Sequence, residues 1–191
     1  MKKEVVTAIL LLALGTAAPL AAASPQGKME QKPTFAAVLD HSLSGVEREV
    51  VPAAEAMPDD KFNFAPTQGE FKGVRTFAQQ IKHIAAVNYV FGAAILSEKP
   101  PVELGGENGP DNITSKADVV KFLKDSFAYL HKALNTINES NVLEQMQSPF
   151  GPNKITRLGL ATIAIGHPFD HYGQMVEYLR MNNIIPPASR K

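Results

Sequence analysis

Four stretches in which apolar residues recur every three or four positions constrain the fold more than any other feature of this chain. They span about residues 34–57, 76–97, 115–134 and 156–181. Such spacing is typical of amphipathic α-helices that bury one side. No stretch shows a convincing strand pattern, so we expect an all-α chain. Four helices, each apolar on one side, pack most simply as a four-helix bundle.

The ends and interruptions of these helices have local signals. Thr34 is an acceptable N-cap for the first helix, and Ser115 with Asp118 resembles a capping box for the third. Pro52 is expected to kink the first helix or to end it early, because proline lacks the N–H and clashes with the preceding turn. Residues 99–114, which are rich in proline and glycine, are expected to form a loop at the rim of a site.

The N-terminus has the three parts of a secretory signal peptide. Met1–Lys3 is basic, Val5–Leu20 is mostly apolar, and the alanines 21–23 offer a small-residue cleavage site before Ser24. A membrane anchor is the alternative, but an apolar run of about 16 residues is short of the roughly 20 that a spanning helix needs. We therefore expect cleavage after the third alanine.

We accordingly divide the chain into a signal peptide (1–23), a disordered leader (24–32) and one bundle domain (33–191). Cleavage would export the mature protein to the periplasm or out of the cell, with no stable membrane anchor. The chain has no cysteine, so it has neither a disulfide nor a lipoprotein acylation site, and the domain must depend on its core.

Charge narrows the classes of partner. The chain has 19 basic (Lys+Arg) and 19 acidic residues, a formal net charge of zero, and no visible basic stripe. Proteins that bind nucleic acids usually carry a basic excess, so we expect no nucleic-acid partner. A small-molecule substrate or ligand is the expected partner. Whether the protein forms a homodimer is left open.

The fourth predicted helix carries the most informative residues. His167 and His171 are four positions apart, so they lie on one helix face, one turn apart, and two such imidazoles can reach one metal ion. Gln174 and Tyr178 continue the same stripe. We interpret this face as one wall of a metal site. Asp170 is the nearest acid, and it either orients an imidazole or, as we favour, faces solvent.

Pro168 directly follows the first of these histidines. A proline within a helix costs about 3 kcal/mol and disfavours helical geometry in the residue before it. Two local structures are open: a kinked but continuous helix, or a break in which Gly166 closes one helix and Pro168 starts the next. We favour the continuous helix, because the apolar pattern runs from Leu158 to Leu179 without a polar loop.

The order of these elements resembles a known family. A helix with a histidine, a long loop, a helix and a second long loop precede a C-terminal motif, which reads His171-Tyr172-Gly173-Gln174, then Tyr178-Leu179-Arg180 and Pro186-Pro187. Over about residues 33–189 this order is similar to the DinB/YfiT-like family. The resemblance implies a four-helix bundle and a metalloenzyme whose divalent ion is held by one histidine of the second helix and two of the fourth. In this chain these ligands are His83, His167 and His171.

Three neutral imidazoles leave at least one coordination position open, which is the usual pattern of a catalytic metal site. Imidazole suits zinc, nickel, copper and iron, and manganese is a further candidate, so the identity of the ion is open. A bound water would become acidic enough to act as nucleophile or base. His41 on the first helix is an alternative fourth ligand. Gln80 is expected to line the pocket together with Gln174 and Tyr178, while no residue is assigned a catalytic role.

These observations favour a metal-dependent enzyme with hydrolytic or transferase-type chemistry, acting on an unknown small molecule outside the cytoplasm. The alternative from another class is a non-catalytic extracytoplasmic metal- or ligand-binding protein. Some members of the family that the chain resembles are thiol-dependent transferases or isomerases, so a thiol-dependent S-transferase is a further alternative. Export weakens it, because low-molecular-weight thiols are mainly cytosolic reductants.

Overall fold

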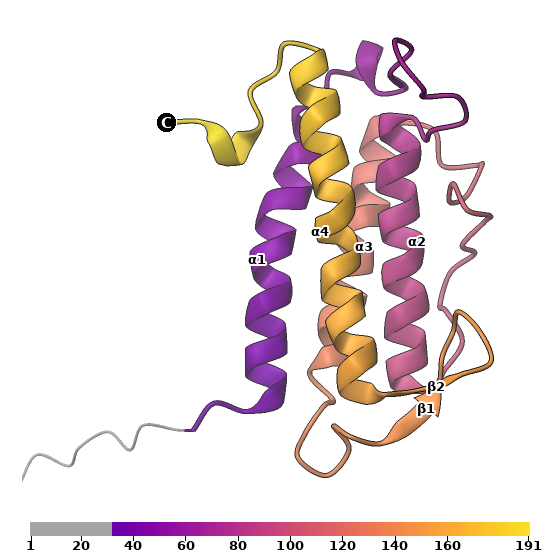
Figure 1. Ribbon diagram of the computed structural model, residues 1–191, viewed down its shortest axis with the longest axis vertical. Coiled ribbons are helices and arrows are strands. Elements are labelled where there is room, and N and C mark those ends of the chain that lie inside the picture. The colour runs from indigo at the N-terminus through magenta and orange to yellow at the C-terminus, as the bar shows by residue number, and fades with distance from the viewer. Residues whose placement is uncertain (1–31) are drawn as a thin grey trace, which may run out of the picture. The chain divides into compact units, whose positions relative to one another are not determined.

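Four long helices make up most of the part of the chain that the structure describes, residues 32–191 of a computed structural model (Figure 1). They are α1 (Phe35–Ala56), α2 (Phe77–Leu96), α3 (Lys116–Leu134) and α4 (Arg157–Met181). The prediction of four helices is confirmed, with boundaries close to the expected ones. The predicted signal peptide, and all but the last residue of the predicted leader, lie outside the described residues.

Each helix begins at a hydroxyl-bearing N-cap. Thr34 accepts a hydrogen bond from the first turn of α1, as predicted. The complete capping box belongs to α2: the Thr76 N–H donates to Gln79 Oε1 (2.8 Å), and the Gln79 N–H donates to Thr76 Oγ1 (3.2 Å). At α3, Ser115 Oγ accepts from the Asp118 N–H but donates to the Asp118 carboxylate. The carboxylate therefore holds the cap side chain rather than the cap backbone.

Both internal prolines lie within continuous helices. α1 continues beyond Pro52, and α4 runs without a break through Pro168. The alternative of a helix break at Pro168 is therefore wrong, and His167 and His171 share one helix. Each proline removes one backbone hydrogen bond. At Pro168 the ring is buried, so packing offsets part of that loss.

A small hairpin corrects the prediction that the chain has no strand. β1 (Gln145–Gln147) and β2 (Lys154–Thr156) pair antiparallel just before α4. Three-residue strands are too short for an alternating pattern to be read from sequence. Two short 3-10 helices, Asp59–Lys61 and Pro187–Ser189, are also present. Within residues 32–191, no helix is both long and apolar enough to cross a membrane.

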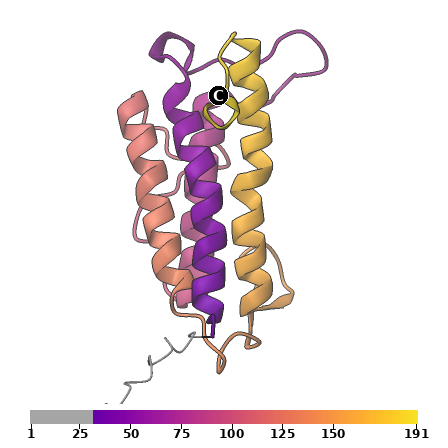
Figure 2. The same ribbon diagram turned by 90° about the vertical axis from the view of Figure 1, so that its left-hand side faces the viewer.

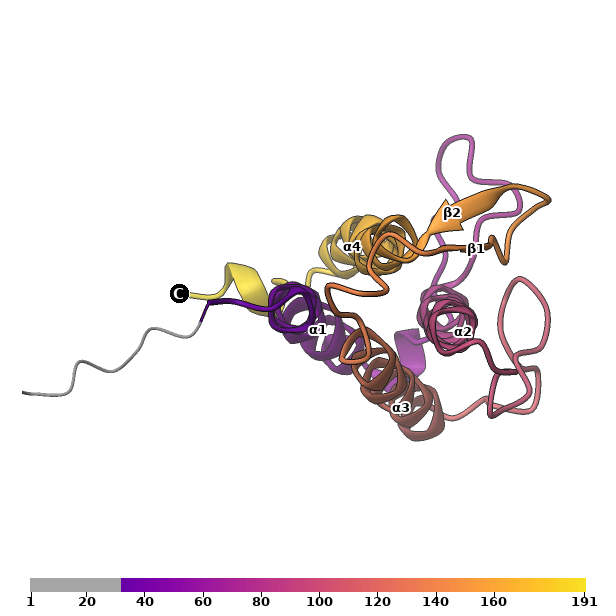
Figure 3. The same ribbon diagram turned by 90° about the horizontal axis from the view of Figure 1, so that it is seen from below.

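The helices follow the order α1, α4, α2, α3 around the bundle, as Figure 3 shows. α2 and α3 run in the same direction, because Tyr129 near the end of α3 donates a hydrogen bond to Glu98 just after α2. α2 and α4 run in opposite directions, because Gln80 near the start of α2 donates to Gln174 near the end of α4. Since α2 and α3 are parallel, residues 97–115 return along the bundle beside α2 (Figure 1).

α2 is the most enclosed helix, with 15 of its 20 residues buried. α3, α4 and the returning segment 97–115 all pack against it, so its polar side chains need internal partners. Lys82 Nζ donates to the Pro110 carbonyl (2.8 Å), and Asn88 donates to Ser126 Oγ (3.2 Å). The largest fully buried side chains of the core include Leu43, Met57, Phe77, Ile81, Ile84, Phe91, Leu123, Phe127 and Leu130.

α1 packs against α3 on one side and against α4 on the other (Figure 2). The contact between α1 and α3 includes a charged cluster, in which His131 Nδ1 lies 2.6 Å from Asp40 Oδ1 and His131 Nε2 lies 3.1 Å from Glu47 Oε2. By the order of the helices, this cluster lies across the bundle from the contact between α2 and α4. His131 therefore links α1 to α3 and is remote from His83, His167 and His171.

Candidate metal site

The structure brings three histidines together where α2 crosses α4. His83 on α2 faces His167 and His171 on α4, and one ring nitrogen from each lies within 4.8 Å of the other two. The His167 Nε2 atom is 3.2 Å from the Nε2 atoms of both His83 and His171. His171 is buried, whereas the other two are half-buried. The helical spacing of the α4 pair and the antiparallel packing of α2 against α4 are sufficient to produce this cluster.

His83 is held in one tautomer by the segment that follows α2. Its Nδ1 atom lies 2.7 Å from the carbonyl oxygen of Glu107, and a carbonyl only accepts, so Nδ1 carries the hydrogen. A neutral His83 then presents a lone pair at Nε2, toward His167. A second ring nitrogen donating to a backbone carbonyl is the usual support for a metal-ligating histidine.

Hydrogen bonding alone does not account for the three facing nitrogens. An imidazole nitrogen has one in-plane position, which holds either a hydrogen or a lone pair. His167 Nε2 has two nitrogen neighbours at the same distance, so at most one of these contacts is a good hydrogen bond. The Nδ1 atoms of His167 and His171 are buried and have no hydrogen-bond partner within residues 32–191. The cluster is therefore poorly satisfied as a purely protein arrangement.

A divalent ion fits the same geometry. Two imidazole nitrogens bound at about 2.0–2.1 Å with a tetrahedral angle between them lie roughly 3.3 Å apart. The two 3.2 Å separations from His167 match this spacing, and the third pair of nitrogens, from His83 and His171, lies within 4.8 Å. The donor set has three imidazoles and no carboxylate, which suits zinc, copper, iron or nickel better than magnesium or calcium.

Burial and mutual repulsion keep these imidazoles neutral. Burial, and then the nearby His171 and His83, lower the pKa of His167 to about 3. Burial also lowers the pKa of His171, with His83 the next cause, and it lowers the pKa of His83, with Arg75 the next cause. Since a metal binds only the neutral ring, the site is deprotonated and ready to bind at neutral pH.

The segment that supports His83 is itself anchored to α2 and to the preceding loop. Arg75 donates from Nε to the Glu107 carbonyl (3.3 Å) and pairs through Nη2 with the Glu107 carboxylate (2.9 Å). Gly109 has φ of 75°, and a Cβ atom there would lie 2.5 Å from the Cβ of Lys82. Only glycine allows the segment to approach α2 this closely. Glu107 therefore has a defined position beside His83.

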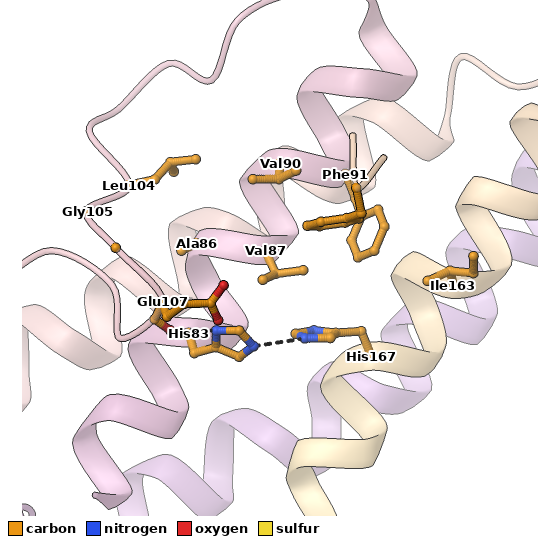
Figure 4. Close-up of a pocket in the computed structure, with 12 residues that line it drawn as sticks. His83, Ala86, Val87, Val90, Phe91, Leu104, Gly105, Glu107, Ile163 and His167 are labelled. Carbon is orange, nitrogen blue, oxygen red and sulfur yellow. Dashed lines mark hydrogen bonds between the residues drawn. The ribbon is translucent and has the colours of Figure 1, made fainter. Parts of the chain in front are cut away.

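One cavity opens beside the cluster, and a second cavity lies next to the first. The first, of about 680 Å³, has His83 and His167 in its wall together with mostly apolar side chains (Figure 4). The second, of about 540 Å³, is polar and is lined by Arg75, Gln80, Glu107, Asn108, Gln174 and Tyr178, among others. Glu107 lines both cavities, so the two cavities meet at this residue.

The residues predicted around the site fall into two groups. Gln80, Gln174 and Tyr178 line the polar cavity. Asp170 is exposed and lines neither cavity, and its Oδ2 atom accepts a long hydrogen bond from Gln174 Nε2 (3.5 Å). His41 is exposed on α1 and is not part of the cluster, so the alternative of a fourth histidine ligand is wrong.

Arg75 and Glu107 were not found by sequence reasoning. Both lie in irregular segments, and the contacts that bring them to the site join residues far apart in the sequence. The glycines at 105 and 109, where a Cβ atom would meet backbone or Lys82 at 2.5 Å, were a signal of tight packing around Glu107.

Comparison with known proteins agrees with this fold. The sequence model described as the DinB superfamily matches residues 42–175, most of the chain, and this stretch contains all three histidines. A solved structure of a DinB-like protein from Bacillus cereus ATCC 10987 is similar in fold, with a TM-score of 0.61 and 16% sequence identity, over 81% of this chain and 97% of that one. The search of curated proteins found no match.

Proposed function

Because this chain belongs to the DinB superfamily, we propose that it binds a divalent metal ion through His83, His167 and His171 and acts on a small molecule at that ion. The observation that carries the proposal is the convergence of three neutral imidazole nitrogens next to a cavity of about 680 Å³. A ligand set of three histidines beside an open space is the arrangement of catalytic rather than structural metal sites.

The residues of the chain have separable tasks in this proposal. The ion would supply a Lewis acid that polarises a carbonyl or phosphoryl oxygen of the ligand. His83, fixed by the Glu107 carbonyl, sets the direction of one donor nitrogen. An apolar group of a ligand that fills the apolar cavity would displace water from one side of the reacting group, which would strengthen electrostatic interactions there. Arg75 supplies a positive charge on the polar side.

A non-catalytic binding protein is favoured by one observation of its own. Within residues 32–191 no carboxylate joins the three histidines, since Asp170 is exposed and the Glu107 carboxylate pairs with Arg75. A reaction that needs a protein carboxylate as its general base therefore has no candidate in this cluster. The S-transferase alternative avoids this need, because a thiol cosubstrate brings its own nucleophile, and the chain itself has no cysteine.

We also propose that the protein works outside the cytoplasm. The support is the basic start, apolar run and alanine cleavage site of the first 23 residues. In an exported protein, the three imidazoles would be exposed to the metals and small molecules of the periplasm or the medium rather than to those of the cytosol. Cytosolic thiols are scarce there, which favours hydrolytic chemistry or binding over thiol transfer.

Metal binding to purified protein tests the proposal directly. We expect one zinc, nickel or iron ion per chain in elemental analysis of the native protein, and tight one-to-one binding when the metal-free protein is titrated. His83→Ala, His167→Ala and His171→Ala should each lower occupancy strongly, because each removes one of three donors. His131→Ala is the matched control, since it removes a half-buried histidine outside the cluster. Unchanged occupancy after replacing all three would refute the site.

A further inference from the structure

The helix face of α2 that carries His83 changes from polar to apolar along its length. Gln80, one turn before His83, lines the polar cavity. Val87 and Phe91, one and two turns after His83, line the apolar cavity. Positions three or four apart share a face, so these side chains follow one stripe.

The face of α4 that carries His167 and His171 also has a polar end and an apolar end. Gln174 and Tyr178, which follow His171, line the polar cavity, while Ile163, one turn before His167, lines the apolar one. Because α4 runs opposite to α2, polar residues face polar residues and apolar face apolar. The seam between the two helices is therefore polar at one end, apolar at the other, and has the three histidines between.

The apolar end exposes large side chains that would be costly to leave in water. Ile163 and Phe150, both in the wall of this cavity, are 50% and 61% exposed. Val90 and Phe91 of α2 face Ile163 across the space, as Figure 4 shows. An apolar group of a ligand would cover them and be removed from water itself.

The polar end has two unmet requirements. Gln80 is 3% exposed, and its buried Oε1 atom has no hydrogen-bond partner in the described part of the chain, so a ligand donor would satisfy it once the amide turns toward the polar cavity. The Arg75 guanidinium has five donors and, within residues 32–191, one acidic partner, the Glu107 carboxylate, whose side chain is 85% exposed. A ligand anion could replace the Glu107 carboxylate at Arg75 at little cost, because the released carboxylate would be well solvated.

From this we infer that the seam takes a small anionic amphiphile lengthwise. Its anionic group pairs with Arg75, an adjacent N–H donates to Gln80, and its apolar tail enters the cavity beside Phe91, so that its central polar group lies at the three histidines. N-acyl amino acids have this order of groups. This inference rests on the proposed function and names the substrate class of the same site.

Calorimetric titration with N-acylglycines tests the inference. The probes are N-acetyl-, N-butanoyl-, N-hexanoyl- and N-octanoylglycine, each added to zinc-loaded and to metal-free protein. We expect affinity to rise about tenfold for each two-carbon step until the tail fills the cavity, because each buried methylene adds several-fold to a binding constant. The methyl ester of N-octanoylglycine, which lacks the anion, should bind about tenfold more weakly than the acid.

Two variants separate the two ends. Arg75→Gln should weaken every acid by a similar factor, keep the dependence on chain length, and bind acid and ester alike. Ile163→Asn should reduce the dependence on chain length and keep the preference for the acid. Arg48→Gln, an exposed arginine on α1, and Phe169→Asn, an apolar residue of α4 that is 53% exposed and lines neither cavity, are the matched controls and should change neither property.

Either of two results would overturn the inference: affinity that does not depend on chain length, or equal binding of acid and ester by the parent protein. Neither readout requires the ion, because Arg75 and Ile163 are not in the histidine cluster. Both dependences persisting in a protein that binds no metal would refute the proposed function while supporting the amphiphile site. Metal binding without dependence on chain length or on the anion would support the proposed function and refute the amphiphile site.

Discussion

Gly109→Ala tests whether the segment 97–115 controls the metal site. The added Cβ would lie 2.5 Å from the Cβ of Lys82, whereas ordinary carbon contacts begin near about 3.5 Å, so the segment must move by roughly 1 Å. If Glu107 moves with it, the 2.7 Å contact from its carbonyl to His83 Nδ1 lengthens to about 3.7 Å, beyond hydrogen-bond range. Loss of such a partner typically lowers metal affinity by about 10–100-fold.

The same substitution has a separate effect on folding. An alanine at φ of 75° is strained, so the free energy of unfolding of the metal-free protein should fall by about 1–3 kcal/mol. Metal affinity is measured by competition with a chromophoric chelator, and unfolding by urea titration of the metal-free protein. The two measurements separate loss of the site from loss of the fold.

Gly106→Ala is the matched control in the same segment. A Cβ at Gly106 meets nothing within 4 Å, and its backbone is not in the left-handed region, so both affinity and stability should stay near those of the parent. The reasoning fails if Gly109→Ala binds metal as tightly as the parent, or if the two glycine variants lose the same affinity.

Four further outcomes are expected. Pro168→Ala should keep the fold and regain one backbone hydrogen bond while lowering metal affinity, as measured by chelator competition; unchanged affinity would mean that the proline has no role in aiming the preceding histidine. The metal-free protein should lose stability as pH falls from 6.5 toward 3, by roughly 1.4 kcal/mol per pH unit from His167 alone. The reason is that this histidine binds a proton near pH 6.5 in the unfolded chain but stays neutral in the folded protein, where its pKa is lowered to about 3. Urea titrations between pH 7 and pH 4 that give constant stability would contradict this. His131→Ala should lower the free energy of unfolding by roughly 1–2 kcal/mol, since Asp40 and Glu47 both lose their contact with the imidazole and Asp40 keeps its hydrogen bond from Asn135, and should leave metal occupancy unchanged. Mass measurement of the exported protein should give a chain that begins at Ser24, and a cytoplasmic product that retains the first residues would rule out export.

The helices of this protein were predictable because each needs one buried face, and a buried face leaves a repeat in the sequence. The same reasoning placed His167 and His171 on one side of a helix, since their separation is local. It did not reveal the hairpin β1–β2, whose strands are shorter than the pattern that identifies a strand. The long helices could therefore be predicted from the sequence, whereas the short strands could not.

The rest of the site depends on contacts between distant segments. His83 has no local feature that distinguishes it from a packed histidine, and only the family resemblance pointed to it. Arg75 and Glu107 are 32 residues apart, and their ion pair forms because the parallel arrangement of α2 and α3 carries the segment 97–115 back past His83. No periodic pattern encodes that return path, so its contribution to the site appears only in three dimensions.

The cluster also changes how this chain resists unfolding. His83 and His167 are 84 residues apart, and the chain has no cysteine with which to close a loop of that length covalently. An ion held between α2 and α4 would act as a reversible cross-link there, and the loop entropy that it would remove from the unfolded chain is of the size attributed to a long-loop disulfide, about 4–5 kcal/mol. Unlike a disulfide, this cross-link would depend on the free metal concentration, so under the proposed function the melting temperature of the protein would rise with the metal supply of its surroundings.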